Sequence, residues 1–251
     1  MAGGDFRSVN RLYRLDAPSE CRGIDPFGAS RLSCESVGKV RPNMTPCAPA
    51  PERAICALCI GGRNMDIVNA LDAATDEFGR RLGLVGQDAW TLPTPCPDWD
   101  VHYLAAHVVG GNRFASHILG GMPAMEAIEL VMASPQLGDD ALRAWASTSA
   151  MQATAFNVDG ALERQIDHPL GQISGREFLE FRVFDITLHA WDLARAIGAD
   201  EQLAPHLVDV VLNIVETGPL GMGFGIAALG NVGASASAQA KLLDLTGRTP
   251  T

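Results

Sequence analysis

The stretch of sequence that most clearly defines the fold is 174–198, which reads SGREFLEFRVFDITLHAWDLARAIG. Ser174 and Glu177 have the spacing of a capping box, in which the serine covers an orphan backbone N–H and the glutamate reaches back to the helix start. Gly198 is the residue type with which helices commonly end. The stretch therefore predicts one long helix over about 175–197.

Three more long helices are predicted before this one. Residues 66–84 place apolar side chains at spacings of three and four with charges between them, as on the buried face of an amphipathic helix. Residues 101–119 follow Asp100, a suitable N-cap, and a further helix over about 139–157 is expected to be capped by Asp139 or Asp140. Four main helices with short connections predict an all-α, antiparallel four-helix bundle.

The remaining segments predict shorter elements. Residues 124–133 and 204–217 are expected to be helical, and 161–173, with two Gly or Pro breaks, is expected to be a loop or a short hairpin. The tail from Gly218 is rich in Gly, Ala and Ser until 241–245. We find no alternation of β-branched residues long enough for a sheet.

The first 64 residues differ from the rest. They hold five of the six cysteines, a Pro-rich run and no sustained helical or strand periodicity. We expect residues 1–64 to be a disordered extension, or the result of a start codon assigned too far upstream, and 65–251 to form the helical domain.

The alternative for the N-terminal cysteines is a small zinc knuckle. Cys56 and Cys59 have the spacing of one ligand pair. Cys34 and Cys47 are too far apart to supply the second close pair that such a site needs, so the sequence favours the disordered extension.

Composition excludes several classes of function. A net charge of −10 argues against a general nucleic-acid binder, because phosphate contacts need clustered Lys and Arg. No uninterrupted apolar stretch of about 18 residues is present, so no membrane span is expected. The arginines near the N-terminus are not followed by the apolar run of a secretory signal, and a cytoplasmic location is therefore expected.

Three residues are candidate metal ligands. His107 has apolar neighbours that place its imidazole on the core side of its helix, although a lone inward histidine is more often a hydrogen-bonded core residue. Asp185 and His189 are four apart, so they share one face of the helix over 175–197. A carboxylate in such apolar surroundings is costly unless it is paired or metal-bound. Two histidines and one carboxylate would leave coordination positions open, as catalytic sites require; the alternative is an Asp–His hydrogen bond.

Two further residues could support this site. Asp192, three residues after His189, could accept a hydrogen bond from that imidazole and fix its tautomer. The alternatives are a salt bridge with Arg195 or a solvated position. Cys96, between two prolines, is expected to be a small buried residue in a tight turn, with a reactive thiol as the alternative. The histidines expected to be ordinary surface or core residues are His102, His117, His168 and His206.

Three stretches carry a resemblance to a known family. Residues 94–113 read TPCPDWDVHYLAAHVVGGNR, and residues 188–198 read LHAWDLARAIG. They resemble the mycothiol-dependent maleylpyruvate isomerase N-terminal domain, which belongs to the DinB-like metal-binding four-helix bundles. The closing stretch 241–248, KLLDLTGR, resembles the tail of an actinobacterial-type branch. The likeness covers about 66–251.

This resemblance implies a metal site and a thiol cofactor. The family's ligand positions fall on His107, Asp185 and His189, and its usual metal is zinc. Its usual carboxylate is glutamate, so the shorter Asp185 requires a closer helix or a bridging water. Characterised members use mycothiol in isomerisation or thiol transfer, which implies a small thiol and an electrophilic substrate as partners.

The sequence therefore leaves three hypotheses. The first is a metal-dependent isomerase or S-transferase that uses mycothiol or a similar thiol. The second is a non-catalytic metal-binding or ligand-binding module with the same fold. The third is a structural helical protein without metal. The oligomeric state is not indicated.

Overall fold

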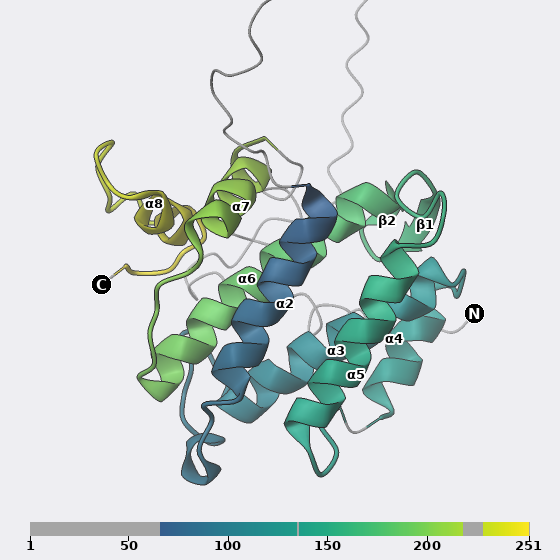
Figure 1. The fold of residues 1–251 in the computed structure, drawn as a ribbon, viewed down its shortest axis with the longest axis horizontal. Coiled ribbons are helices and arrows are strands. Elements are labelled where there is room, and N and C mark those ends of the chain that lie inside the picture. The colour runs from purple at the N-terminus through teal and green to yellow at the C-terminus, as the bar shows by residue number, and fades with distance from the viewer. Residues whose placement is uncertain (1–65, 135, 218–227, 251) are drawn as a thin grey trace, which may run out of the picture. The chain divides into compact units, whose positions relative to one another are not determined.

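The structure is a computed structural model that describes residues 66–134, 136–217 and 228–250 (Figure 1). The expectation of a disordered extension over 1–64 lies outside the described residues, as does the glycine-rich part of the tail over 218–227.

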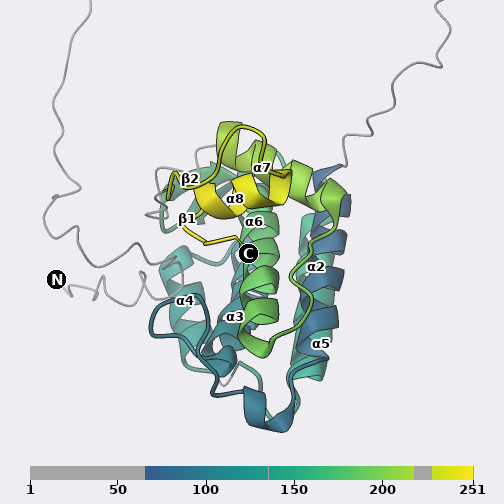
Figure 2. The ribbon, with the colours of Figure 1, turned by 90° about the vertical axis from the view of Figure 1, so that its left-hand side faces the viewer.

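The four main helices lie where the sequence predicts them. They are α2 (Ile67–Leu82), α3 (Val101–Leu119), α5 (Ala141–Phe156) and α6 (Gly175–Ile197). Helices α2 and α3 each contact both α5 and α6, which closes a ring of four helices (Figures 1 and 2). The prediction of an all-α, DinB-like helical bundle is confirmed.

Helices α3 and α6 run antiparallel. Their contacts pair rising residue numbers on α3 with falling numbers on α6: His107 lies against Asp185, and Asn112 against Arg182. This arrangement brings side chains from the middle of both helices to one place inside the bundle.

The helix ends follow the local signals in the sequence. The hydroxyl of Ser174 accepts from the backbone N–H of Glu177, and the Glu177 carboxylate accepts from the backbone N–H of Ser174. Gly198 ends α6 in the left-handed conformation, with φ 66°. Asp100 and Asp140 cap α3 and α5, each accepting from the backbone N–H three residues later. The capping box is therefore confirmed.

Smaller elements surround the bundle. They are the 3₁₀ turn η1 (Gln87–Ala89), α4 (Ala124–Met132), α7 (Pro205–Thr217), α8 (Ala238–Leu245), β1 (Gln165–His168) and β2 (Gly171–Ser174). The strands pair antiparallel, so the segment between α5 and α6 is a short hairpin rather than a loop. Helix α8 occupies the part of the tail that the sequence left unassigned. It packs on α7.

Helix α6 is the most buried of the main helices. Its side chains from Phe178 to Ala194 are almost all inaccessible to solvent, and aliphatic and aromatic residues of α2, α3 and α5 surround them. Polar groups on α6 therefore need partners inside the bundle. Among the described residues, no helix combines the length and apolar character needed to cross a bilayer.

Candidate metal centre

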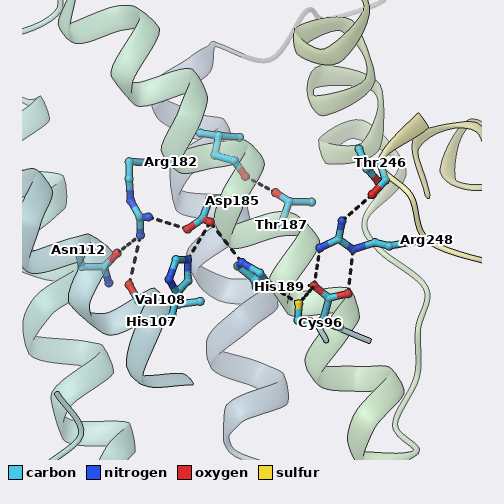
Figure 3. A network of polar contacts seen from close by, with 12 residues as sticks. Cys96, His107, Val108, Asn112, Arg182, Asp185, Thr187, His189, Thr246 and Arg248 are labelled. Atoms are coloured by element: carbon cyan, nitrogen blue, oxygen red, sulfur yellow. Dashed lines mark hydrogen bonds and ion pairs between the residues drawn. The ribbon is translucent and has the colours of Figure 1, made fainter. Parts of the chain in front are cut away.

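The structure brings the three predicted ligands together. Asp185 Oδ1 lies 3.2 Å from His107 Nε2 and 3.3 Å from His189 Nε2. The centres of the two imidazole rings are 5.0 Å apart, and the rings meet edge to face. Figure 3 shows Asp185 between the two histidines, one from α3 and the other a turn further along α6.

One buried atom of this group lacks a hydrogen bond. His189 Nε2 is inaccessible to solvent and, among the described residues, has no hydrogen-bond partner, because its contact with Asp185 Oδ1 is not aligned as one. One ligand atom from each of the three residues lies within 4.8 Å of the other two. Imidazole nitrogens and a carboxylate oxygen suit zinc and similar divalent ions. The three residues therefore fit a metal ion, which would satisfy the orphaned nitrogen.

Arg182 fixes the carboxylate of Asp185. Its Nη1 donates to Asp185 Oδ2 over 2.7 Å, which leaves Oδ1 facing the imidazoles. Its other nitrogens donate to Gln152 Oε1 (2.8 Å), Asn112 Oδ1 (2.9 Å) and the carbonyl of Val108 (3.3 Å). This buried arginine is absent from the sequence-based candidates. Its position three residues before Asp185, on the same helical face, is the signal that could have indicated it.

Asp192 contacts His189 at Nδ1, the ring nitrogen that does not face Asp185. Its Oδ2 lies 3.0 Å from His189 Nδ1, the contact that the sequence suggested. Its salt-bridge partner is not Arg195, which pairs with Glu201, but Arg248 from the C-terminal segment. The carboxylate of Asp192 is fully buried.

Cys96 belongs to this supporting group. Its Sγ donates to Asp192 Oδ2 over 3.4 Å and lies 3.8 Å from His189 Nδ1. Burial, together with the charge of Asp192, raises the pKa of the Cys96 thiol. The geometry favours the small buried residue over the reactive thiol. Cys96, His189 and Asp192 also lie close enough to hold a metal, but both oxygens of Asp192 are already engaged by Arg248.

Trp99 forms one wall of the site. Its ring centre lies 4.8 Å from that of His107 and 5.5 Å from that of His189, and its side chain is buried. Both Trp99 and Arg248 belong to the stretches that carry the family resemblance. The sequence analysis did not predict a role in the site for either residue. Of the other histidines, His168 is buried, His117 is half-buried, and His102 and His206 are exposed.

The pKa values of the three candidate ligands depend on burial and on the charges of one another. Burial lowers the pKa of His107, which favours its neutral form. Burial would raise the pKa of Asp185, but His107, His189 and Arg182 outweigh it and hold that pKa well below its usual range. Burial opposes a charge on His189 as well, but Asp185 and Asp192 raise the His189 pKa well above its usual value. These neighbours therefore favour an ionised Asp185 and a protonated His189, and a metal ion that binds His189 would replace this proton.

A small cavity of about 140 Å³ reaches His107 from the side of α4. The residues that line it are Tyr103, Ala106, His107, Gly110, Val131, Met132, Ser134 and Gln136. Its walls are mostly apolar, so it offers a place for an uncharged part of a ligand beside one of the candidate metal ligands.

Comparison with known proteins assigns the family. The family model of the mycothiol maleylpyruvate isomerase N-terminal domain matches residues 71–194. Two curated relatives, the uncharacterized proteins MT0763 and Rv0738 of Mycobacterium tuberculosis, are each 34% identical over 143 residues, which cover 57% of this chain and 74% of the relative. The chain belongs to the mycothiol maleylpyruvate isomerase N-terminal domain family.

Two solved structures are also similar. The crystal structure of the mycothiol-dependent maleylpyruvate isomerase is 17% identical, with a TM-score of 0.47 and coverage of 61% of this chain and 70% of that chain. A histidine-to-alanine mutant of that enzyme gives 18% identity and a TM-score of 0.48 over the same shares.

Proposed function

We propose that this protein binds a divalent metal ion through His107, Asp185 and His189 and acts as a thiol-dependent enzyme of the isomerase or S-transferase type. The observation that carries the proposal is the meeting of His107 Nε2, Asp185 Oδ1 and His189 Nε2 inside the bundle, where the buried His189 nitrogen has no aligned hydrogen bond among the described residues. Zinc is the ion we expect, because the ligands are imidazoles and a carboxylate. When bound, such an ion would lower the pKa of a coordinated thiol and hold it as thiolate.

The charges around the site favour an anionic ligand. Asp185 is paired with Arg182 and Asp192 with Arg248, so the negative charges of the two carboxylates are each balanced by an arginine. With neutral imidazoles, the protein contributes no net charge at these groups. A divalent ion would therefore keep most of its positive charge and would prefer a thiolate to a neutral ligand.

The family membership supports a thiol as cofactor. We propose mycothiol or a similar small thiol as the nucleophile and a conjugated electrophile as the substrate. Thiolate addition to a double bond, rotation about the resulting single bond and expulsion of the same thiolate would isomerise the substrate and return the thiol. Trp99 and the surrounding apolar side chains would limit the access of water to the reacting groups.

The test combines elemental analysis with calorimetry on the full chain purified without a histidine tag. We expect about one metal ion per chain, and thiol binding that requires this ion. His107→Ala and His189→Ala should lose the metal, whereas the control His206→Ala, at an exposed histidine of α7, should retain it. A metal content below about 0.2 per chain after zinc loading would favour the metal-free structural hypothesis instead.

A non-catalytic metal-binding module is the second candidate. The engagement of Asp185 Oδ2 by Arg182 favours it, because only one oxygen of this short carboxylate faces the imidazoles. Metal-loaded protein that binds thiols but transforms none of a panel of conjugated electrophiles would support this candidate over the enzyme.

A further inference from the structure

The C-terminal segment reaches the metal centre through Arg248. This arginine lies three residues after the end of α8, and its side chain is buried against α6. Its Nε donates to Asp192 Oδ1 over 2.8 Å and its Nη2 to Asp192 Oδ2 over 2.6 Å, so the guanidinium takes both carboxylate oxygens. Figure 3 shows Arg248 on the far side of His189 from Asp185.

Arg248 is itself held by its own segment. Its backbone N–H donates to the carbonyl of Leu243 on α8 over 2.8 Å. The remaining guanidinium nitrogen, Nη1, donates to the carbonyl of Thr246 over 3.0 Å. The position of the guanidinium is therefore determined by how α8 and the residues after it pack on the bundle.

The position of the Asp192 carboxylate in turn orients the imidazole of His189. A carboxylate bound at both oxygens by one guanidinium cannot rotate freely, so Oδ2 lies in a defined place, 3.0 Å from His189 Nδ1. An imidazole that donates from Nδ1 leaves Nε2 as the atom that can bind a metal. In this structure His189 Nε2 faces Asp185 Oδ1 and is the orphaned atom described above.

We propose that Arg248 is a positioning residue of the metal centre: through Asp192 it holds the His189 ring with Nε2 directed at His107 and Asp185. The inference rests on the proposed metal site. Arg248 lies outside residues 71–194, which match the family domain. Arg248 therefore acts on the site from outside the matched residues.

The direction in which Arg248→Met changes the zinc affinity separates a positioning role from a purely electrostatic one. Arg248→Met removes a positive charge near the site, which by charge alone would tighten the binding of a cation. Loss of a group that orients a histidine ligand weakens metal binding by about 10- to 100-fold. We expect weaker zinc binding, by about tenfold or more.

Companion variants test whether the effect passes through Asp192. Arg248→Lys keeps the charge but cannot take both oxygens, so we expect a smaller loss of affinity in the same direction. In an Asp192→Asn background, Arg248→Met should have no further effect on zinc affinity, because the carboxylate through which Arg248 acts on His189 is already absent. The matched control is Arg195→Met, which removes an arginine of α6 that pairs with Glu201.

The experiment is a zinc titration of the full chain by competition with a chelator, at one pH, with thermal melts to report folding. The absorption spectrum of the cobalt-substituted protein gives a second readout, because it reports the ligand geometry and would not respond to a purely structural role of Arg248. We expect altered cobalt bands in Arg248→Met and unaltered bands in Arg195→Met.

Each outcome bears on one of the two proposals. If the unsubstituted protein binds no zinc, both the proposed function and this inference are wrong. If it binds zinc, but Arg248→Met binds as tightly or more tightly with unchanged cobalt bands, the proposed site stands and the positioning role is overturned. If Arg248→Met does not fold, Arg248→Lys decides by the same two readouts.

Discussion

At the scale of single residues, Gly111 shows how closely the centre is packed. A Cβ at this position would lie 2.3 Å from Arg182 Nη1 and under 3 Å from two further guanidinium atoms. The guanidinium cannot easily move away, since it is bound to Asp185, Asn112 and Gln152. The Arg182–Asp185 ion pair therefore requires a residue without a side chain at position 111.

Gly111→Ala should consequently destabilise the protein. Alanine in a helix interior normally gains about 1 kcal/mol over glycine. Here we expect a loss of about 1–3 kcal/mol, because the displaced Arg182 would leave buried polar groups unpaired. Urea denaturation followed by circular dichroism measures this. Gly110→Ala, whose Cβ would meet only side-chain atoms of Val131 and Gln136 at 3.3 Å or more, is the control. If Gly111→Ala is as stable as the control, the position of Arg182 does not depend on glycine at residue 111.

At the scale of elements, the start of α6 depends on the capping box. Ser174→Ala removes the acceptor for the backbone N–H of Glu177, and we expect a cost of about 1 kcal/mol in the free energy of unfolding. Zinc affinity should be unchanged, since Asp185 and His189 lie several turns further along the helix. Thr154→Ala, which removes an exposed hydroxyl from the last turn of α5, is the control and should cost less than about 0.5 kcal/mol. A parallel loss of zinc affinity in Ser174→Ala would show that α6 transmits changes from its end.

The hairpin strand β1 carries a pH-sensitive group. His168 packs against Phe178, with its ring centre 5.4 Å from that of the phenylalanine, and its Nδ1 accepts from the backbone N–H of Leu170. Burial lowers the pKa of His168 to about 4, from a value of 6.5 for the free side chain. The unfolded chain therefore takes up this proton at a higher pH than the folded protein does.

Stability should accordingly fall as the pH drops from about 6.5 to about 4, with a contribution from His168 of at most about 3 kcal/mol. His168→Gln should flatten this part of the curve of unfolding free energy against pH, measured by urea denaturation. His206→Gln removes an exposed histidine and should keep the slope. An identical slope in both variants would rule out His168 as the group responsible.

At the scale of the whole molecule, the candidate site joins segments that are far apart in the chain. His107 is on α3, Asp185 and His189 are on α6, and Arg248 follows α8. A metal ion that binds only the folded arrangement stabilises it by mass action, by about 2.7 kcal/mol at a free concentration one hundred times Kd.

Zinc should therefore raise the melting temperature of the full chain, and a chelator should reverse the increase. Differential scanning calorimetry measures this. His107→Ala should abolish the zinc-dependent increase, while His102→Ala, at an exposed histidine earlier on α3, should retain it. A melting temperature that does not respond to zinc in the unsubstituted protein would argue against a metal site built by the fold.

The limits of sequence-based prediction are clear at Asp192. The sequence offered Arg195 as its ion-pair partner, because that residue is only one helical turn away. The structure pairs Asp192 with Arg248, 56 residues along the chain, and Arg195 with Glu201. Likewise, the sequence did not indicate that Trp99 lies against His107, or that Arg182 also reaches Asn112 and Gln152, because these contacts join residues far apart in the chain.

What the sequence by itself determined was local: the helix bounds, the capping box at Ser174, the acidic cap at Asp100 and the one-face spacing of Asp185 and His189. These follow from hydrogen bonds and side-chain periodicity within a few residues of each other. Only the tertiary structure decided that His107 meets the pair on α6 and that Arg182 and Arg248 each hold a carboxylate. It also decided that one buried nitrogen of His189 has no aligned hydrogen bond within the part of the chain that the structure describes. Those contacts depend on how the helices pack against one another, and packing is set by the whole core rather than by any one stretch of sequence.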